Sequence, residues 1–409
     1  MIPQPQPIGV GDFPAALVLV AGGDTGAERY NRWLADPASD SVDGVRAGLG
    51  AYADLADLVG YLVGMCDDLP TPTENTPPEL AALLLSAQAG AAVEADPPAA
   101  VTLLRRAATR CAGTAPHLAG TLLGTAGTLA AHHDLPGSRD DLETALELLD
   151  GAGLPATMAE LHHALGGVEH AEALAADRPL QQAMRHYYAG LRLISEEDHP
   201  LVWAGLQLDL ATAQLATPMK QATDQLRIGV AAQALRACRR VFTVDEHPVP
   251  WSTATLNLAN ALVYLPSTHR EDNLREAAQL YEEILVSGVR DDDAPGRARV
   301  LCNQGNALAH LGVFDRATAV LAEARFLFET ALDHDGVLTV RQILDEIAKA
   351  TVGFDAEREA AGAARQSEKM GRVDPGGTGR TAGMGVTPRP PEAAQKRATV
   401  TVVAHRDRP

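Results

Sequence analysis

The chain has 409 residues, of which 46% are hydrophobic, 21% are charged and only 4% are aromatic, a composition typical of a soluble protein whose core is built mainly from Leu, Val and Ala. Its net charge of -19 at pH 7 argues against nucleic acid as a partner, because nucleic-acid-binding proteins need a basic face that neutralises phosphates. The four cysteines stand far apart without a C-x-x-C pair, which argues against a zinc ribbon or a redox dithiol and favours buried thiols in a reducing compartment.

Residues 1–69 are interpreted as a helical N-terminal cap region. Their first apolar run, in MIPQPQPIGVGDFPAALVLVAGG, has no basic residue before it and is shorter than a membrane span. We therefore expect neither a signal peptide nor an anchor, and a cytoplasmic protein. Asp24 is predicted to begin a helix that runs through Trp33, although the stretch AALVLVA is equally compatible with a strand. LPTPTENTPP has the composition of a linker, placed at residues 70–78.

The stretch VLVAGGDTG, residues 18–26, resembles the active-site loop of aspartic proteases. That chemistry needs two carboxylates that share one proton, and hence two such loops or a homodimer in an all-β fold. This chain has one Asp-Thr-Gly, and helical patterns follow it. Asp24 is therefore interpreted as a helix cap, and a hydrolase that uses Asp24 is kept as an alternative.

Residues 79–350 show apolar residues three or four apart with turn signals about every 15 to 20 residues, a pattern that predicts one helix after another. HPLVWAGLQLDLATAQL and HPVPWSTATLNLANAL begin alike, with Trp203 and Trp251 48 residues apart. NQGNAL repeats NLANAL after 46 residues, and fainter copies cover residues 117–149 and 156–194. Since one helix pair cannot bury both apolar faces alone, the sequence predicts an all-α solenoid of about six stacked antiparallel helix pairs.

The third copy, GNALAHLGVFDRATAVLAEA, resembles a tetratricopeptide repeat. Gly305 and Ala307 are small where the two helices of such a repeat cross, and Gly312 and Phe314 shape the turn. The packing face of the second helix carries Ala317, Leu321 and Ala324.

The resemblance spans about residues 114–331 and is strongest over residues 248–331. The two Trp copies have a longer loop between their helices and are similar to a long-period variety found in multi-repeat bacterial signalling proteins. The resemblance implies a superhelix whose concave face binds a protein or peptide.

In tetratricopeptide arrays the first helices of successive repeats line the concave face, and an Asn in the N-L-G motif reaches the bound peptide. The matching positions here are Asn257 and Asn303, with Asp209 in the earlier copy. Arg299 stands four residues before Asn303, so one helix face presents a guanidinium and amides. An Asn that only bonds the neighbouring repeat explains the pattern equally well. The predicted binding residues are Asp209, Asn257, Asn260, Arg299, Asn303 and Asn306.

A histidine-rich stretch, with His162, His163, Glu169 and His170, looks like a set of metal ligands. Residues seven apart on a helix are separated by about 10.5 Å along the axis, which is too far to share one zinc. The chain has no H-E-x-x-H, no G-x-S-x-G and no phosphate-binding GK[ST]. We therefore expect no catalytic residue, no metal and no cofactor.

The predicted function is that of a non-enzymatic scaffold or adaptor that binds a protein or peptide, with neither nucleic acid nor membrane as a partner. A sensor for a small molecule or signalling peptide is the alternative from another class, and it requires a deep enclosed pocket. The array is expected to close with LTVRQILDEIAKA, residues 338–350. Residues 351–409 are predicted to be a disordered basic tail, because the segment from Gly371 onward has little apolar content and carries a net charge of +4 on an otherwise acidic chain.

Overall fold

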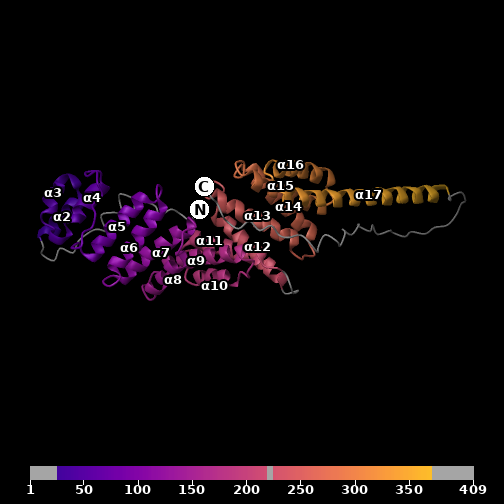
Figure 1. Cartoon of the computed structure of the whole chain (residues 1–409). Coiled ribbons are helices and arrows are strands. Elements are labelled where there is room, and N and C mark those ends of the chain that lie inside the picture. The colour runs from indigo at the N-terminus through magenta and orange to yellow at the C-terminus, as the bar shows by residue number, and fades with distance from the viewer. Residues whose placement is uncertain (1–24, 219–223, 371–409) are drawn as a thin grey trace. The chain divides into compact units, whose positions relative to one another are not determined.

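The computed structural model describes residues 25–218 and 224–370, and every regular element in these ranges is a helix (Figure 1). This confirms the all-α fold class. The chain divides into two compact units, Met1–Leu206 and Gln207–Pro409, with the boundary inside one helix, α11 (Pro200–Ala216). Across the described residues, no helix combines the length and the apolar composition that crossing a bilayer requires.

The first unit begins with α2 (Thr25–Ala35), α3 (Val42–Arg46) and α4 (Ala53–Leu62). Their core centres on Tyr30 and Trp33, both fully buried, and it continues into the helix that follows the predicted linker. The N-terminal helices therefore share a core with the array. Asp24 and the stretch AALVLVA lie outside the described residues, so the cap interpretation and the hydrolase alternative stay predictions.

The segment predicted as a linker contains no helix before Pro78, where α5 begins, but side chains of the array hold it in place. The Gln88 amide donates a hydrogen bond to the carbonyl of Pro70 at 3.0 Å. The Arg110 guanidinium donates to the carbonyls of Thr73 and Thr76 at 3.2 and 3.3 Å. These contacts fasten the segment along the surface of the first helix pair.

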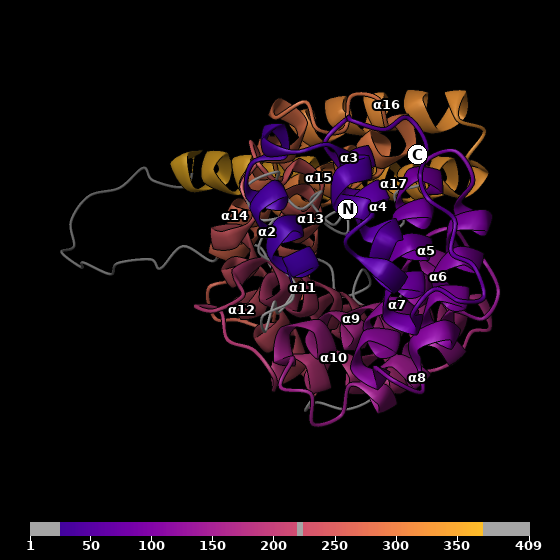
Figure 2. The ribbon, with the colours of Figure 1, turned by 90° about the vertical axis from the view of Figure 1, so that its left-hand side faces the viewer.

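Three helix pairs follow in the first unit, and Figures 1 and 2 show their helices following one another, each beside the next. Proline occupies the first turn of four of the six helices, where its missing N–H breaks no hydrogen bond. The helices are α5 (Pro78–Ala92), α6 (Pro97–Cys111), α7 (Pro116–His132), α8 (Ser138–Leu148), α9 (Pro155–Ala175) and α10 (Gln181–Leu191).

The second unit repeats this arrangement and adds a closing helix, α17 (His334–Met370). Before it come α11, which straddles the boundary, then α12 (Asp224–Val241), α13 (Pro248–Tyr264), α14 (Arg270–Val286), α15 (Ala294–His310) and α16 (Phe314–Thr330). The described chain from α5 to α16 thus holds the six predicted pairs, three grouped with each unit. The fold is that of an α-solenoid in its succession of packed pairs.

The turn between α15 and α16 forms as the sequence pattern predicts. Gly312 has a φ of 75°, a left-handed conformation that residues with a Cβ adopt less readily. The Gly312 N–H bonds the carbonyl of Ala309, and the Val313 N–H bonds that of Leu308, both at 3.0 Å. This pair of bonds is a Schellman motif, which ends α15 and lets α16 begin at Phe314.

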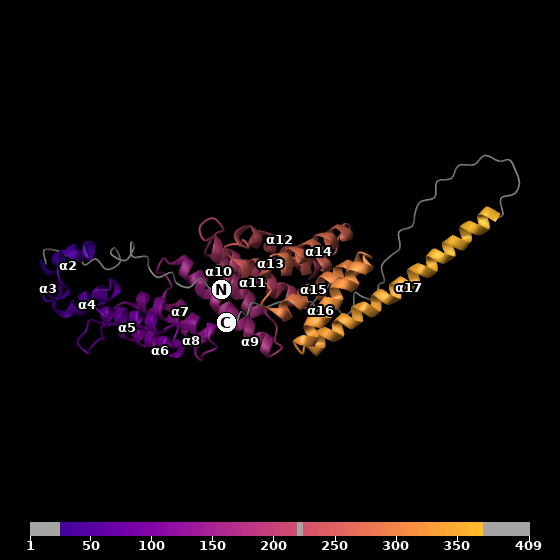
Figure 3. The same ribbon diagram turned by 90° about the horizontal axis from the view of Figure 1, so that it is seen from above.

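Helix α17 covers the last pair, because Val340 and Ile347 are buried against Leu321 and Phe328. It runs to Met370, beyond α16 in Figure 3, so the prediction of disorder from residue 351 was wrong for residues 351–370. The physical reason is their content of Ala, Glu, Arg and Lys, which are strong helix formers. The remainder of the predicted tail, residues 371–409, lies outside the described residues.

Glycine lets the two helices of a pair approach each other closely in this core. A Cβ on Gly166 would lie 2.4 Å from the ring of Tyr187, and one on Gly305 would lie 2.5 Å from Cγ of Leu321. Both distances are far below van der Waals contact. The backbone of one helix at each glycine therefore lies directly against a side chain of the other helix. Gly305 thus has the packing role that the repeat resemblance implies.

Gly305→Ala is expected to lower the free energy of unfolding by about 1 to 3 kcal/mol, because Leu321 must move to admit the methyl group. Gly90→Ala is the matched control, since a Cβ there meets nothing within 4 Å. That variant should gain about 0.5 to 1 kcal/mol from helix propensity alone. Urea denaturation measures both, and a stabilised Gly305→Ala variant would refute the close crossing.

Candidate functional site

The predicted binding residues lie on three helices of the second unit, α11, α13 and α15. The 48- and 46-residue spacings arrange five of them, together with Thr212, in two rows across these helices. The first row holds Asp209, Asn257 and Asn303, and the second holds Thr212, Asn260 and Asn306. The two rows are one turn apart on each helix. Side chains of one row contact side chains of the other row on a neighbouring first helix.

An equivalent hydrogen bond between the two rows joins α11 to α13 and α13 to α15. Nδ2 of Asn257 donates to Oγ1 of Thr212 at 2.9 Å, between residues 45 positions apart. Nδ2 of Asn303 donates to Oδ1 of Asn260 at 3.0 Å, between residues 43 positions apart. Each bond joins a first-row side chain to a second-row side chain on the first helix of the preceding pair. We call this repeated pair of contacts the amide ladder.

The amide ladder is supported by bonds on either side of it. Oγ1 of Thr212 also donates to the carbonyl of Leu208 at 2.8 Å, so the hydroxyl accepts from Asn257 and donates to its own helix. The hydroxyl of Tyr281, on α14, donates to Oδ1 of Asn260 at 2.7 Å. Because that oxygen accepts two bonds, Asn260 links three helices of the second unit.

The sequence analysis predicted Asn257 and Asn260 as binding residues on an open face. In the structure neither residue lies on an open face. Asn257 is fully buried and Asn260 is 4% exposed. The reason is the position of α13, which is buried on all sides from Ser252 to Val263 because helices pack against every face of it. A partner cannot reach these two amides without separating the helices.

The remaining predicted residues are half-buried, and three of them share one face of α15. Arg299, Asn303 and Asn306 occur at positions i, i+4 and i+7. Neither Arg299 nor Asn306 forms a hydrogen bond or an ion pair within the part of the chain that the structure describes. His310 continues the same face one turn later, where burial and the nearby positive charge of Arg270 lower its pKa. We call these four residues the α15 face. Asp209, on α11, is half-buried as well.

The α15 face carries side chains that can form directed polar contacts. An unpaired guanidinium can bind a carboxylate through two parallel hydrogen bonds. Amide side chains both donate and accept, so they suit the N–H and C=O groups of a peptide backbone. Within the described residues, no group of three His, Cys, Asp or Glu side chains is placed to hold a metal ion.

The histidines of α9 make contacts within the helix pair. Nδ1 of His162 lies 3.2 Å from Nδ1 of His186 on α10, so one ring donates and the other accepts. Nδ1 of His170 lies 3.3 Å from the hydroxyl of Tyr187. Burial, together with the charge of His186, lowers the pKa of His162 to about 4, and burial lowers the pKa of His186 too. Both rings are therefore neutral near pH 7 and share a single proton across their bond.

Asn257→Ala is expected to destabilise the chain by about 1 to 3 kcal/mol, because it breaks the ladder bond in a buried setting. Asn306→Ala removes an amide that has no partner within the described residues, so it should change stability by less than about 0.5 kcal/mol. Chemical denaturation of the two variants distinguishes packing from surface positions. Equal effects would contradict the structural role of the ladder.

The histidine pair predicts that stability falls as the pH drops. The unfolded chain takes up a proton on His162 near pH 6.5, whereas the folded chain does so only near pH 4. The unfolded state therefore binds more protons between these values, and the contribution to stability is lost through that window. With partial solvent screening, we expect His162 to account for about 1 kcal/mol between pH 7 and pH 5.

The test of the histidine pair compares denaturation at pH 7 and pH 5 in the parent and in His162→Asn, which keeps a polar atom near Nδ1 but does not titrate. The pH dependence should become shallower in this variant. His117→Asn, at an exposed position, should retain the slope of the parent. A slope that is unchanged in both variants would rule out the histidine pair as its source.

Comparison with known families adds no identification: no protein-family model matches the chain, and no curated protein matches it significantly. The succession of packed helix pairs is compatible with a tetratricopeptide-like fold. That likeness rests on the helical architecture and on the motif at Gly305, Gly312 and Phe314.

Proposed function

We propose that this chain is a non-catalytic scaffold or adaptor that binds an extended peptide segment of a partner protein along the α15 face. The observation that carries the proposal is Arg299, a half-buried guanidinium with no hydrogen bond or ion pair among the described residues. Asn303 and Asn306 lie on the same face, one turn and two turns further along the helix.

Electrostatics support a carboxylate as the group that meets Arg299. A partly buried charge has lost some of its hydration, and a charge-assisted hydrogen bond to a carboxylate replaces that hydration with a directed contact. The chain carries 53 acidic residues against 34 basic ones, yet none of the described acids is bonded to this guanidinium. A carboxylate from outside the chain therefore suits the position.

The two amides support binding of a peptide backbone. Asn303 uses Nδ2 in the amide ladder, which orients the side chain and leaves Oδ1 as an acceptor. Asn306, one turn later, is free to donate and to accept. Such contacts hold a backbone with little regard to its side chains, so specificity would come from the carboxylate and from neighbouring apolar contacts.

The tetratricopeptide-like arrangement supports the same proposal, because first helices of successive repeats carry the binding face in that family. The proposal also includes membership of the tetratricopeptide-repeat proteins, a bacterial origin and a cytoplasmic location. An acidic chain with a net charge of -19 is a poor match for nucleic acid.

The proposal is tested with an array of random peptides that end either in a free carboxylate or in an amide. The parent chain should retain a subset of the peptides with a carboxylate. Arg299→Ala should weaken their binding by about 2 kcal/mol or more, because the contact is charge-assisted and partly desolvated. Its melting temperature should stay close to that of the parent, since Arg299 bonds to none of the described residues.

Arg325→Ala is the matched control, because Arg325 is exposed on α16 and its ion pair with Glu329, at 3.5 Å, is local. It should bind peptides as the parent does. Retention of the same peptides by Arg299→Ala, or a drop in its stability without loss of binding, would contradict the proposal.

A further inference from the structure

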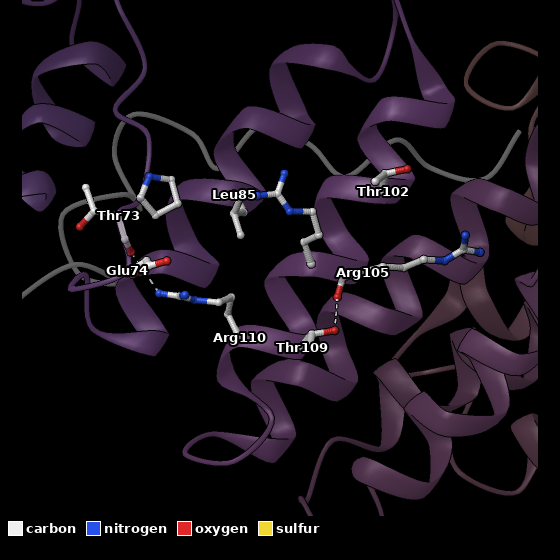
Figure 4. A pocket seen from close by; sticks show the side chains of 9 residues that line it. Thr73, Glu74, Leu85, Thr102, Arg105, Thr109 and Arg110 are labelled. Carbon is white, nitrogen blue, oxygen red and sulfur yellow. Dashed lines mark hydrogen bonds between the residues drawn. The ribbon is translucent and has the colours of Figure 1, made fainter.

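The first unit holds a cleft of about 570 Å³ between the fastened segment before α5 and the helix α6 (Figure 4). Thr73 and Glu74 lie on one side of it, Leu85 is part of its wall, and three arginines of α6 line the other side. These are Arg105, Arg106 and Arg110. A concentration of arginines is unexpected on a chain with an excess of acidic residues, so their pairing decides what the cleft can do.

Arg105 is neutralised within the fold. Its Nε donates to Oδ2 of Asp141 at 2.8 Å, and its Nη2 donates to the carbonyl of Pro136 at 2.8 Å. In Figure 4 its side chain runs away from Thr73 and Glu74. Arg105 therefore contributes to packing between α6 and α8, and it leaves the charge of the cleft to the other two arginines.

Arg106 and Arg110 keep their charges unneutralised. Arg106 is exposed and forms no hydrogen bond or ion pair with the described residues. Arg110 is bonded through Nη2 to two neutral carbonyls, those of Thr73 and Thr76, which orient the guanidinium without cancelling its charge. Glu74 stands on the opposite side but forms no ion pair with either arginine, and the three side chains together leave a positive charge.

The spacing of the two arginines creates a preference for an anion. They are four residues apart on α6 and therefore share one helix face, where like charges repel. An anion placed between them removes this repulsion and accepts hydrogen bonds from both. Arg110 is already held by the carbonyls, so little further ordering is needed when a ligand binds.

The size and wall of the cleft limit the ligand further. A volume of about 570 Å³ falls within the range of small-molecule sites. Pro72 supplies partly exposed apolar surface beside the arginines, and Leu85, only 3% exposed, closes the wall. A ligand that fits both features has a charged head and a compact apolar body.

We propose that this cleft binds a small organic anion, with a carboxylate or phosphate head between Arg106 and Arg110 and an apolar part against Pro72. The site lies in the first unit and does not depend on the α15 face. Because both kinds of head group can accept paired hydrogen bonds from arginine, the experiment has to separate them.

The probes are phenyl phosphate and benzoate, which join the two head groups to the same ring, with benzamide as the neutral counterpart. Calorimetric titration of the full chain at low ionic strength should show binding of phenyl phosphate or benzoate but not of benzamide. Inorganic phosphate should bind more weakly than phenyl phosphate, because it lacks the apolar part. Added salt should weaken binding, since the arginines are solvent-accessible.

Arg106→Gln is the decisive variant, because Arg106 is exposed and forms no hydrogen bond or ion pair with the described residues whose loss would disturb folding. It should weaken binding at least about tenfold, the effect of one charge-assisted hydrogen bond, with an unchanged melting temperature in the absence of ligand. Arg325→Gln, in the other unit, should bind as the parent does. Equal weakening in both variants, binding of benzamide as tight as that of benzoate, or no binding of either anion at millimolar concentration would overturn the proposal.

Discussion

A helix pair with two apolar faces is stable only when another pair covers it, and this constraint governs the whole chain. It explains why proline begins so many of the helices, since each must start abruptly after a short turn. It also explains α13, whose position between neighbours buries a dozen consecutive residues. At the last described pair, α17 supplies the cover through Val340 and Ile347.

Burial on all sides has a chemical consequence for polar side chains. An amide inside such a helix must find a partner on a neighbouring helix, because an unpaired buried group is costly. Nδ2 of Asn257 bonds to Thr212, and Oδ1 of Asn260 accepts from Asn303 and Tyr281. The other polar atom of each amide is buried and has no partner among the described residues. The ladder thus links α11, α13 and α15, the first helices of successive pairs. The hydrogen bond is repeated because the sequence is repeated. On α15, Asn303 continues the ladder, whereas Asn306, the equivalent of Asn260, is half-buried and forms no such bond among the described residues.

The sequence predicted the helical array well, because its signals are local. Apolar spacing, Gly305 at a crossing and Gly312 at a turn each act within one hairpin. The burial of Asn257 and Asn260 was not predictable from the same signals. Periodicity places a residue on a helix face but does not say what covers that face. The 48-residue spacing from Thr212 to Asn260 was the available hint of a ladder. The extent of α17 was missed because the Gly- and Pro-rich composition after residue 370 was applied to the Ala-rich stretch before it.

The arginine cleft was hidden from the sequence for a related reason. Arg106 and Arg110 stand out only when the segment around Thr73, more than thirty residues earlier, folds back to form the opposite wall. In this acidic chain, many arginines form ion pairs with nearby carboxylates, as Arg29, Arg139, Arg236 and Arg275 do. Other guanidinium groups form no ion pair with the described residues, even though an acid such as Glu74 lies across the same cleft. Arg299 and Arg106 are two such positions, one on each unit, and both lie beside surface that an anion from outside the chain can reach.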